Sequence, residues 1–316
     1  MDRAIEALPA TPSRAVTSAV PASRLVLGTA QFGMAYGATN ERGQVSEAAV
    51  AQILSLAQAA GIDTVDTAAA YGDSEAILGA CLADFPAVEV ITKTPACPGD
   101  RISAADADAL RASLERSLAR LRRSKVDAVL LHQGPDLLKP GGDRLARALE
   151  ALKGAGLAAR IGVSIYDGAE LDGILQRLSP DIVQAPLNLF DQRLIENNHI
   201  ARLKSAGVEI HARSIFLQGV LLADPRRRHG YFKPFDRKFA AYGATLARAR
   251  LTPLQACLGF VLRQSGADRA VIGVSGMDDF REILATLAAM PSSLPDMGAL
   301  AADDSALIDP RCWRLG

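Results

Sequence analysis

Cysteine is scarce in this sequence. The 316 residues include four cysteines, none of them in a C-x-x-C pair: Cys81, Cys97, Cys257 and Cys312. A disulfide-stapled secreted fold needs a denser set of thiols, and a cysteine-ligated metal site needs closer spacing. We therefore expect reduced thiols and a cytoplasmic protein.

Long apolar runs and an excess of one charge are also missing. No stretch reaches the ~18 apolar residues of a membrane span, so no span is expected. The 35 Lys and Arg residues balance 35 Asp and Glu residues, which argues against a nucleic acid or an anionic membrane as a partner. The brief basic run 226–229 is expected to be a solvated loop. Nothing marks an interface helix, so we expect a monomer or weak homo-oligomer.

The first 22 residues lack the apolar core of a secretory signal. They are rich in Ala, Pro, Ser and Thr, and this composition predicts a flexible arm at residues 1–22, with a transit-like segment as the alternative. Residues 23–316 show no break in composition. We expect them to form a single domain.

Two motifs that would indicate other chemistry are absent. The four histidines are scattered and form neither H-x-H nor H-E-x-x-H, so a metal-dependent hydrolase or isomerase is disfavoured and no metal site is predicted. The fingerprint G-x-G-x-x-G does not follow the first apolar run, where "GTAQFG" stands instead. A doubly wound dinucleotide fold is therefore only the second choice.

What is present is a repeated alternation of short apolar runs with amphipathic stretches. The runs cover residues 25–30, 64–68, 88–93, 126–132, 159–164, 181–186, 208–214 and 269–275. Continuous apolar character is typical of strands covered on both faces, as parallel strands are when each is followed by a helix. Eight such units in series predict an α/β fold, a (β/α)8 TIM barrel.

Helix signals separate these runs. Helix starts are predicted at Ser46, Ser103 and Thr252, the last two with Asp106 and Gln255 at the capping-box position. The loop 215–251 is longer than an ordinary connection and contains a predicted helix at 238–247. Loops of this length in a compact domain usually cover ligands.

Polar side chains end most of the predicted strands. They are Asp66, Lys93, His132, Ser164, Gln184, Arg213, Ser214, Gly273 and Ser275, the glycine being the one non-polar member. Each alone has an ordinary structural explanation, such as a cap, a solvated strand end or a satisfied core histidine. Because the carboxyl ends of barrel strands share one rim, we expect the set to meet there and to form a functional site.

Asp66, Tyr71, Lys93 and His132 together suit proton transfer to a carbonyl oxygen. A phenol has a pKa near ~10 and is a poor acid at neutral pH unless a cation stabilises the phenolate. Lys93 would supply that cation, and Asp66 would keep the buried lysine charged. His132 would donate a hydrogen bond to the substrate oxygen.

Three segments resemble the signature blocks of the aldo-keto reductase superfamily: "DTAAAYGDSEAILG", the lysine in "VITKTP" and the histidine in "VLLHQGPD". The resemblance runs from about residue 24 to 287. It implies a (β/α)8 barrel that uses NADP or NAD without a Rossmann fold, acts on a small-molecule carbonyl substrate and uses Tyr71 as the general acid/base. The catalytic tetrad would be Asp66, Tyr71, Lys93 and His132.

The same resemblance implies the cofactor contacts. They are Thr29, Asp66, Ser164, Gln184, Arg213, Ser214, Phe216, Gln218, Gly219, Gly273, Ser275, Asp279 and Glu282. Ser164 and Gln184 would hold the nicotinamide carboxamide, and residues 214–219 would surround the phosphates. Ile165 stands where the family has Asn. Arg213 replaces the aromatic that stacks on the nicotinamide, and a guanidinium there would repel the oxidised ring.

Cofactor preference and substrate follow from two further segments. Asp279 would oppose a 2'-phosphate and could accept a ribose hydroxyl, with Arg281 nearby, so NAD or dual use is favoured over strict NADP. The opening "LGTAQFGMAYGATN" resembles a bacterial branch associated with sugar or surface-polysaccharide metabolism, which implies a sugar-like aldehyde, ketone or lactol. The replacements at Ile165 and Arg213 motivate the alternative, a catalytically weak nucleotide-binding regulatory protein.

Overall fold

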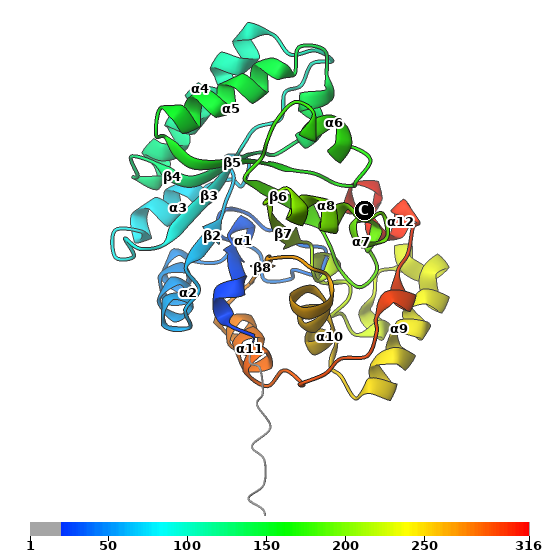
Figure 1. Ribbon diagram of the computed structural model, residues 1–316. Helices are drawn as coiled ribbons and strands as arrows, with labels where there is room; N and C mark the ends of the chain where they lie inside the picture. Colours follow the sequence, from blue (N-terminus) through cyan, green and yellow to red (C-terminus); the bar gives the residue numbers. More distant parts are fainter. Residues whose placement is uncertain (1–19, 316) are drawn as a thin grey trace, which may run out of the picture.

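The computed structural model describes residues 20–315, in which eight parallel strands close a barrel (Figure 1). Each strand pairs with its neighbours in chain order, and β1 pairs with β8 to close the ring. The strands are β1 (Leu25–Gly28), β2 (Thr64–Asp66), β3 (Glu89–Thr94), β4 (Val126–Leu131), β5 (Ala158–Ser164), β6 (Ile182–Pro186), β7 (Glu209–Arg213) and β8 (Arg269–Gly273). All eight predicted strands and the (β/α)8 fold are confirmed.

The barrel interior holds a small apolar cluster below the polar rim. It consists of Ile91, Ala128, Leu130 and Ile182, all fully buried. Side chains two positions apart on a strand point to the same face. Lys93 and Gln184 therefore share the inner face with Ile91 and Ile182, one step nearer the carboxyl ends of the strands. Strand alternation thus carries these two polar groups to the barrel mouth.

Helices surround the barrel (Figure 1). They are α1 (Ala30–Gly33), α2 (Glu47–Ala59), α3 (Ser74–Cys81), α4 (Ala104–Leu121), α5 (Asp143–Gly154), α6 (Leu171–Leu175), α7 (Arg193–Glu196), α8 (His199–Ser205), α9 (Asp236–Ala249), α10 (Pro253–Gly259) with a π-helical turn (Phe260–Gln264), α11 (Met277–Ala288) and α12 (Ser305–Ile308). The predicted starts are confirmed. Ser46 caps α2, and Ser103 and Thr252 form capping boxes on α4 and α10.

The long loop 215–251 contains the predicted helix, observed as α9. Three short 3-10 turns precede it: Leu217–Gly219, Pro225–Arg227 and Gly230–Phe235. The ring of Phe239 on α9 lies edge-on to Phe190, with centroids 5.4 Å apart. This contact anchors the loop to the segment that follows β6.

The basic run 226–229 differs in part from its predicted solvated state. Arg226 is exposed, as expected. Arg228, however, is partly buried, and its Cζ lies 3.6 Å from the centroid of the Phe239 ring. The cause is the aromatic face that α9 offers, because a guanidinium stacks on such a face while keeping its charge.

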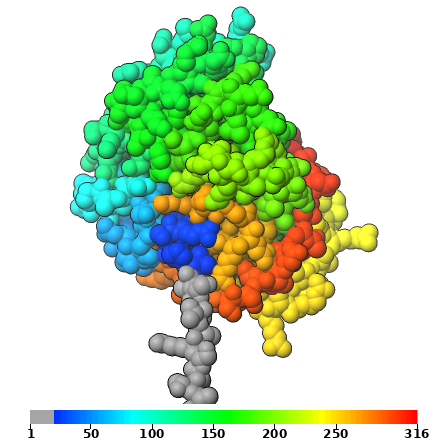
Figure 2. Space-filling view, viewed as in Figure 1, coloured from blue at the N-terminus to red at the C-terminus, as the bar shows by residue number. Residues whose placement is uncertain are grey.

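Ring closure brings the first and the last strand of the barrel together. The space-filling view shows the first part of the barrel, in blue, against the last, in orange (Figure 2). Arg24 helps to hold this contact, because its side chain donates to the backbone oxygens of Ala267 and Asp268 at 2.5 and 2.9 Å. Of the predicted arm, residues 1–19 lie outside the described residues, and Val20 packs in the core.

Two further features bear on the sequence-based expectations. All four cysteines are free. Between residues 20 and 315, none of the helices combines the length and the apolar character that crossing a bilayer requires.

Candidate functional site

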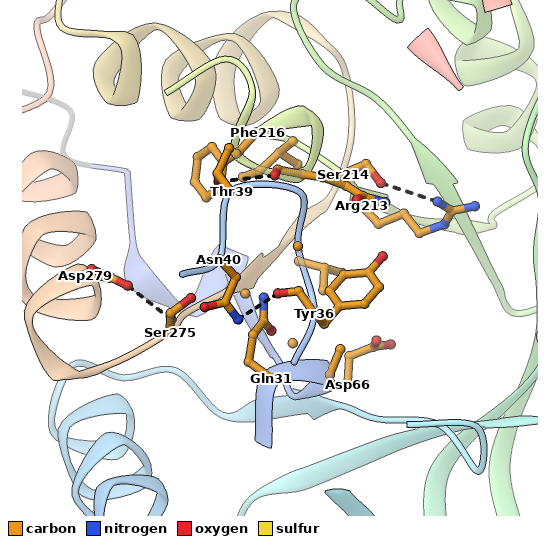
Figure 3. Close-up of a pocket in the computed structure, with 18 of the residues that line it drawn as sticks. Gln31, Tyr36, Thr39, Asn40, Asp66, Arg213, Ser214, Phe216, Ser275 and Asp279 are labelled. Atoms are coloured by element: carbon orange, nitrogen blue, oxygen red, sulfur yellow. Dashed lines mark hydrogen bonds between the residues drawn. The ribbon is translucent and has the colours of Figure 1, made fainter. Parts of the chain in front are cut away.

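A cavity of about 740 Å³ opens at the carboxyl ends of the strands (Figure 3). Thirteen of the predicted site residues line it: Asp66, Tyr71, His132, Gln184, Arg213, Ser214, Phe216, Gln218, Gly219, Gly273, Ser275, Asp279 and Glu282. Ligand pockets in proteins commonly span ~300–1,000 Å³. The polar rim expected from strand ends is therefore one connected site.

Asp66 and Lys93 form a buried ion pair at the floor of the cavity. Lys93 Nζ lies 2.5 Å from Asp66 Oδ1, and the two side chains are 1% and 3% exposed. Lys93 also donates to the Thr67 carbonyl oxygen at 2.9 Å. The second carboxylate oxygen of Asp66 accepts from Gln184 Nε2 at 2.8 Å. Both hydrogen-bond partners of the carboxylate, Lys93 Nζ and Gln184 Nε2, are thus donors.

Tyr71 and His132 stand above this pair. Lys93 Nζ lies 5.1 Å from the centroid of the Tyr71 ring. The Tyr71 and His132 rings meet edge to face, with centroids 5.7 Å apart and planes at 83°. A phenol, an imidazole and an ammonium therefore converge on one end of the cavity, as the sequence pattern predicted.

A close backbone contact positions Tyr71. The turn that carries it continues through Gly72, whose φ is 51°, and packs against Gly33 at the end of α1. A Cβ on Gly33 would lie 1.9 Å from the Tyr71 carbonyl oxygen, and one on Gly72 would lie 2.3 Å from the Gly33 oxygen. Only glycine at both positions permits this approach, which explains the order Tyr-Gly just before α3.

The protonation states of the cluster follow from burial and charge. Burial acts against the charged form of Lys93, but the Asp66 carboxylate and the Tyr71 phenol outweigh it, so the pKa of the ammonium lies above its ordinary value. Burial and the Lys93 ammonium together lower the pKa of His132 to about 4. At neutral pH the lysine is charged and the imidazole is neutral, so His132 can donate one hydrogen bond without adding a charge.

The lowered pKa of His132 predicts a specific pH dependence of stability. The unfolded chain binds a proton to this residue below about pH 6.5, whereas the folded protein resists it until about pH 4. The stability that the neutral imidazole contributes is therefore complete above about pH 6.5, the pKa of the residue in the unfolded chain. It is lost as the pH falls through about 4, the pKa in the folded protein. We expect the wild type to lose about 3 kcal/mol more than His132→Asn between pH 7 and 4. Urea unfolding of both proteins would measure this, and parallel losses would contradict it.

The loop after β7 lines the middle of the cavity. Ser214 and Gln218 adopt left-handed backbone conformations, with φ of 54° and 51°. Non-glycine residues in this region carry strain, and such strain is concentrated at ligand-binding loops. Ser214, Phe216, Gln218 and Gly219 all line the cavity. Their contacts with the cofactor phosphates stay predictions.

Three predicted residues do not line the cavity. Lys93 lies behind Asp66. Thr29 is fully buried, and its hydroxyl donates to the Asp66 carbonyl oxygen at 3.0 Å. Ser164 is buried at the end of β5, in register with Gln184. Thr29 thus supports the backbone of the site, and the cofactor contacts of Thr29 and Ser164 stay predictions.

The sequence-based list missed the segment after β1, which also lines the cavity. Its lining residues include Gln31, Met34, Tyr36, Thr39, Asn40, Glu41 and Arg42. Thr39 lies beside Phe216, and its hydroxyl donates to the Gln218 carbonyl oxygen at 3.4 Å (Figure 3). Tyr36 lies toward Asp66. The available signal was composition, because "GMAYGATNERG" is a polar, glycine-rich stretch directly after a predicted strand. Such a segment belongs to the rim of a barrel mouth.

This segment joins two sides of the cavity. Glu41 pairs at 2.6 Å with Arg227, which lies in the long loop after β7. Arg42 pairs with Asp279 at 3.3 Å, at the start of α11. Arg281 instead pairs with Asp278 at 3.4 Å and lies outside the cavity lining. The basic residue next to Asp279 is therefore Arg42, which the sequence places 237 positions away.

Apolar side chains ring the cavity mouth. Among residues 20–315, the large apolar side chains that are exposed are Met34, Tyr36 and Leu222. All three line this cavity. Exposed apolar groups gathered at one opening are typical of a ligand-binding surface.

Arg213 points toward β5. Its Cζ lies 4.3 Å from the centroid of the Tyr166 ring, and its Nη2 donates to the Ile165 carbonyl oxygen at 2.9 Å. The side chain of Ile165 is fully buried, so its backbone carbonyl oxygen, and not a side chain, makes this polar contact. Arg213 remains part of the cavity lining at the end that holds His132.

No metal-binding group supplements this site. Between residues 20 and 315 there is no cluster of three or more His, Cys, Asp or Glu side chains suited to hold a metal ion. The chemistry available is that of the ion pair, the phenol, the imidazole and the guanidinium.

Comparisons with known proteins agree on one family. Residues 24–301 match the model of the aldo/keto reductase family. The chain is 25% identical over 305 residues to an NADH-specific methylglyoxal reductase of Escherichia coli, covering 86% of this chain and 91% of that one. It is 33% identical over 159 residues to a 6-dehydroglucose reductase of Novosphingobium aromaticivorans, covering 46% and 49%. A holo-form aldo-keto reductase of Bacillus halodurans shares the fold, with TM-score 0.71, 19% identity and 92% and 94% coverage.

Proposed function

The chain belongs to the aldo/keto reductase family, and on that premise we propose that it is a nicotinamide-dependent oxidoreductase of carbonyl compounds. It reduces an aldehyde or ketone, or oxidises the corresponding alcohol or lactol, with Tyr71 as general acid/base. The observation that carries the proposal is the convergence of Tyr71, His132 and the Asp66–Lys93 pair on one end of the cavity.

The residues present fit a nicotinamide dinucleotide. The cavity of about 740 Å³ runs from Tyr71 and His132 to Asp279, and Asp279 and Ser275 lie at the opposite end from Arg213 (Figure 3). The Gln184 nitrogen donates to Asp66, which leaves the amide oxygen to accept from a carboxamide N–H. The hydroxyls of Ser214 and Ser275 suit phosphate and ribose oxygens. When bound, the cofactor supplies or accepts the hydride.

The protein side of the reaction is a proton transfer. Tyr71 donates its proton to the carbonyl oxygen, and the Lys93 ammonium stabilises the phenolate that remains. Asp66 keeps Lys93 charged. The neutral His132 donates a hydrogen bond to the same oxygen and fixes its position. Burial of the ion pair strengthens these interactions, because few water dipoles compete.

The substrate is proposed to be a small, polar carbonyl compound, such as a sugar-like aldehyde. Relatives named as methylglyoxal and 6-dehydroglucose reductases support this class. The aromatic residue Tyr36 lines the same end of the cavity and offers a face on which a sugar ring can pack.

Charge at the far end supports NADH over NADPH. Glu41, Asp279 and Glu282 line that end with one cation, Arg42. The carboxylate of Asp279 holds Arg42 at 3.3 Å and would repel a 2'-phosphate. The Escherichia coli relative is named as NADH-specific.

Changing Asp279 to Asn should shift this preference toward NADPH. The substitution removes a negative charge and frees Arg42 to meet the 2'-phosphate. We expect the ratio of NADPH to NADH affinity to rise about tenfold. Fluorescence titration measures both affinities, and adding Arg42→Ala should cancel part of the gain. Arg281→Ala is the matched control, because Arg281 lies on the same helix but outside the lining. An unchanged ratio in Asp279→Asn would contradict the assignment.

The proposed function is tested by binding and turnover together. Purified protein is titrated with NADH and NADPH, and a panel of aldehydes and sugars is then assayed with the tighter cofactor. Binding with steady turnover is the expected result. Binding without turnover would favour the regulatory alternative, and the absence of both would overturn the proposal.

A further inference from the structure

Arg213 is a partly buried cation without a carboxylate partner. Its Nη2 donates to the Ile165 carbonyl oxygen at 2.9 Å, and its Nη1 to Ser214 Oγ at 3.4 Å. Among residues 20–315, no carboxylate lies within ion-pair distance of it. Asp191, a buried carboxylate in the same region, is held by Arg193 through bonds of 2.8 and 2.9 Å. Asp191 is thus engaged by Arg193, and Arg213 is left without an ion-pair partner in this part of the chain.

A second arginine provides the contrast. Arg311 lies over the same Tyr166 ring, with its Cζ 3.5 Å from the centroid, against 4.3 Å for Arg213. Arg311 is neutralised by Asp309 at 2.6 Å. Two guanidiniums on one ring repel each other, and a cation withdrawn from water is costly unless it is paired. The position of Arg213 therefore favours an anion that the protein itself does not supply.

Among the described cations at the catalytic end of the cavity, Arg213 is the one without an ion-pair partner. Lys93 is matched by Asp66, and His132 is neutral, so Arg213 is the surplus cation. Tyr71, His132 and Arg213 line the same cavity. An anionic group on a bound molecule can thus meet Arg213 while another part of that molecule lies at Tyr71 and His132.

We propose that Arg213 binds a carboxylate of the substrate, so that the substrate class is an oxo acid, an aldehyde or ketone that also carries a carboxylate. This rests on the proposed function. A guanidinium has five N–H donors in a planar fork that matches a carboxylate. Two donors bond to Ile165 and Ser214, which fix the orientation and leave three free. Arg213 is then a residue that determines specificity.

The reaction balances without any further reactant. A hydride from the reduced nicotinamide cofactor forms the new C–H bond at the carbonyl carbon while the C=O π bond breaks. The proton from Tyr71 goes to the oxygen. The product is a hydroxy acid, the cofactor is oxidised by two electrons, and the carboxylate held by Arg213 is unchanged.

Matched substrates test the proposal. Succinic semialdehyde and butanal have the same carbon chain with and without a carboxylate, and kcat/KM is measured for both with NADH. The wild type should prefer the acid by at least about tenfold, because one charge-assisted bidentate contact is worth about that factor or more. Arg213→Gln should abolish the preference, and Arg213→Lys, which keeps the charge without the fork, should retain part of it.

Arg311→Gln is the matched control. It removes the other guanidinium from the Tyr166 ring, where the charge was already paired. The preference for the acid should survive in this variant. Equal loss in both variants would mean that the two arginines only support Tyr166, and it would overturn the proposal.

A binding measurement separates charge recognition from turnover. Calorimetric titration of the NADH-loaded protein with malonate, an unreactive dicarboxylate, should show binding to the wild type and to Arg311→Gln but not to Arg213→Gln. Thermal unfolding checks that each variant is folded. If NADH binds and butanal is reduced but neither acid preference nor malonate binding depends on Arg213, the inference alone fails. If neither cofactor binds and no aldehyde is reduced, the proposed function fails and this inference with it.

Discussion

Tyr71→Phe is expected to lower aldehyde turnover about 1,000-fold, within the range typical of losing a general acid. The substitution removes one hydroxyl and keeps the ring, so the edge-to-face contact with His132 at 5.7 Å can persist. The Asp66–Lys93 pair below it is also retained. Steady-state kinetics with the best aldehyde of the panel measures kcat, and fluorescence titration measures NADH affinity.

The two readouts locate the defect. NADH affinity should stay within a few fold of the wild type, because Tyr71 is one of many residues that line the cavity. A loss confined to kcat assigns the hydroxyl to the chemical step. Turnover that is unimpaired in Tyr71→Phe would refute the role of Tyr71 as the acid. A regulatory protein with incidental activity would show the same low turnover before and after the change.

Lys93→Met should be the most destabilising single change at the site. It removes the ammonium from a pair in which both side chains are almost fully buried and leaves the Asp66 carboxylate without its cation. Breaking a buried pair from one side costs about 3–5 kcal/mol. Urea unfolding at neutral pH measures the free energy of unfolding. The same variant should lose turnover, because nothing then stabilises the phenolate of Tyr71.

A second substitution separates charge from packing. In Asp66→Asn/Lys93→Met the stranded anion is gone, so the double variant should regain most of the stability while staying inactive. The exposed pair of Arg111 and Glu115, at 2.9 Å, provides the control, and Arg111→Met should change stability by at most about 0.5 kcal/mol. If the double variant is as unstable as Lys93→Met, the loss comes from packing and not from an unpaired charge.

The barrel could be predicted because its signals are local. A capping box such as that of Thr252 and Gln255 is complete within four residues, and it starts α10 as the sequence indicated. Apolar runs covered on both faces gave all eight strands. The arrangement of Asp66, Lys93 and His132 followed as well, because parallel strands in a closed ring bring their carboxyl ends to one rim.

Contacts between different elements could not be predicted in this way. Arg228 lies on the ring of Phe239 because α9 presents an aromatic face to it. The protonation state of His132 depends on burial and on a lysine from the neighbouring strand, neither of which a local pattern contains. Thr29 ends the first strand like the other polar rim residues, yet it supports the backbone of Asp66 below the cavity.

The sequence by itself determined the barrel, the order of its strands and the convergence of the catalytic candidates, because strand alternation and chain order leave few ways to place them. The tertiary structure decided what surrounds them. It laid the segment after β1 across the cavity, set Arg42 against Asp279 and turned Arg213 onto Tyr166. The contacts of side chains in these loops depend on which groups lie close in space and on their charges. Residues far apart in the sequence become neighbours only after the barrel has closed.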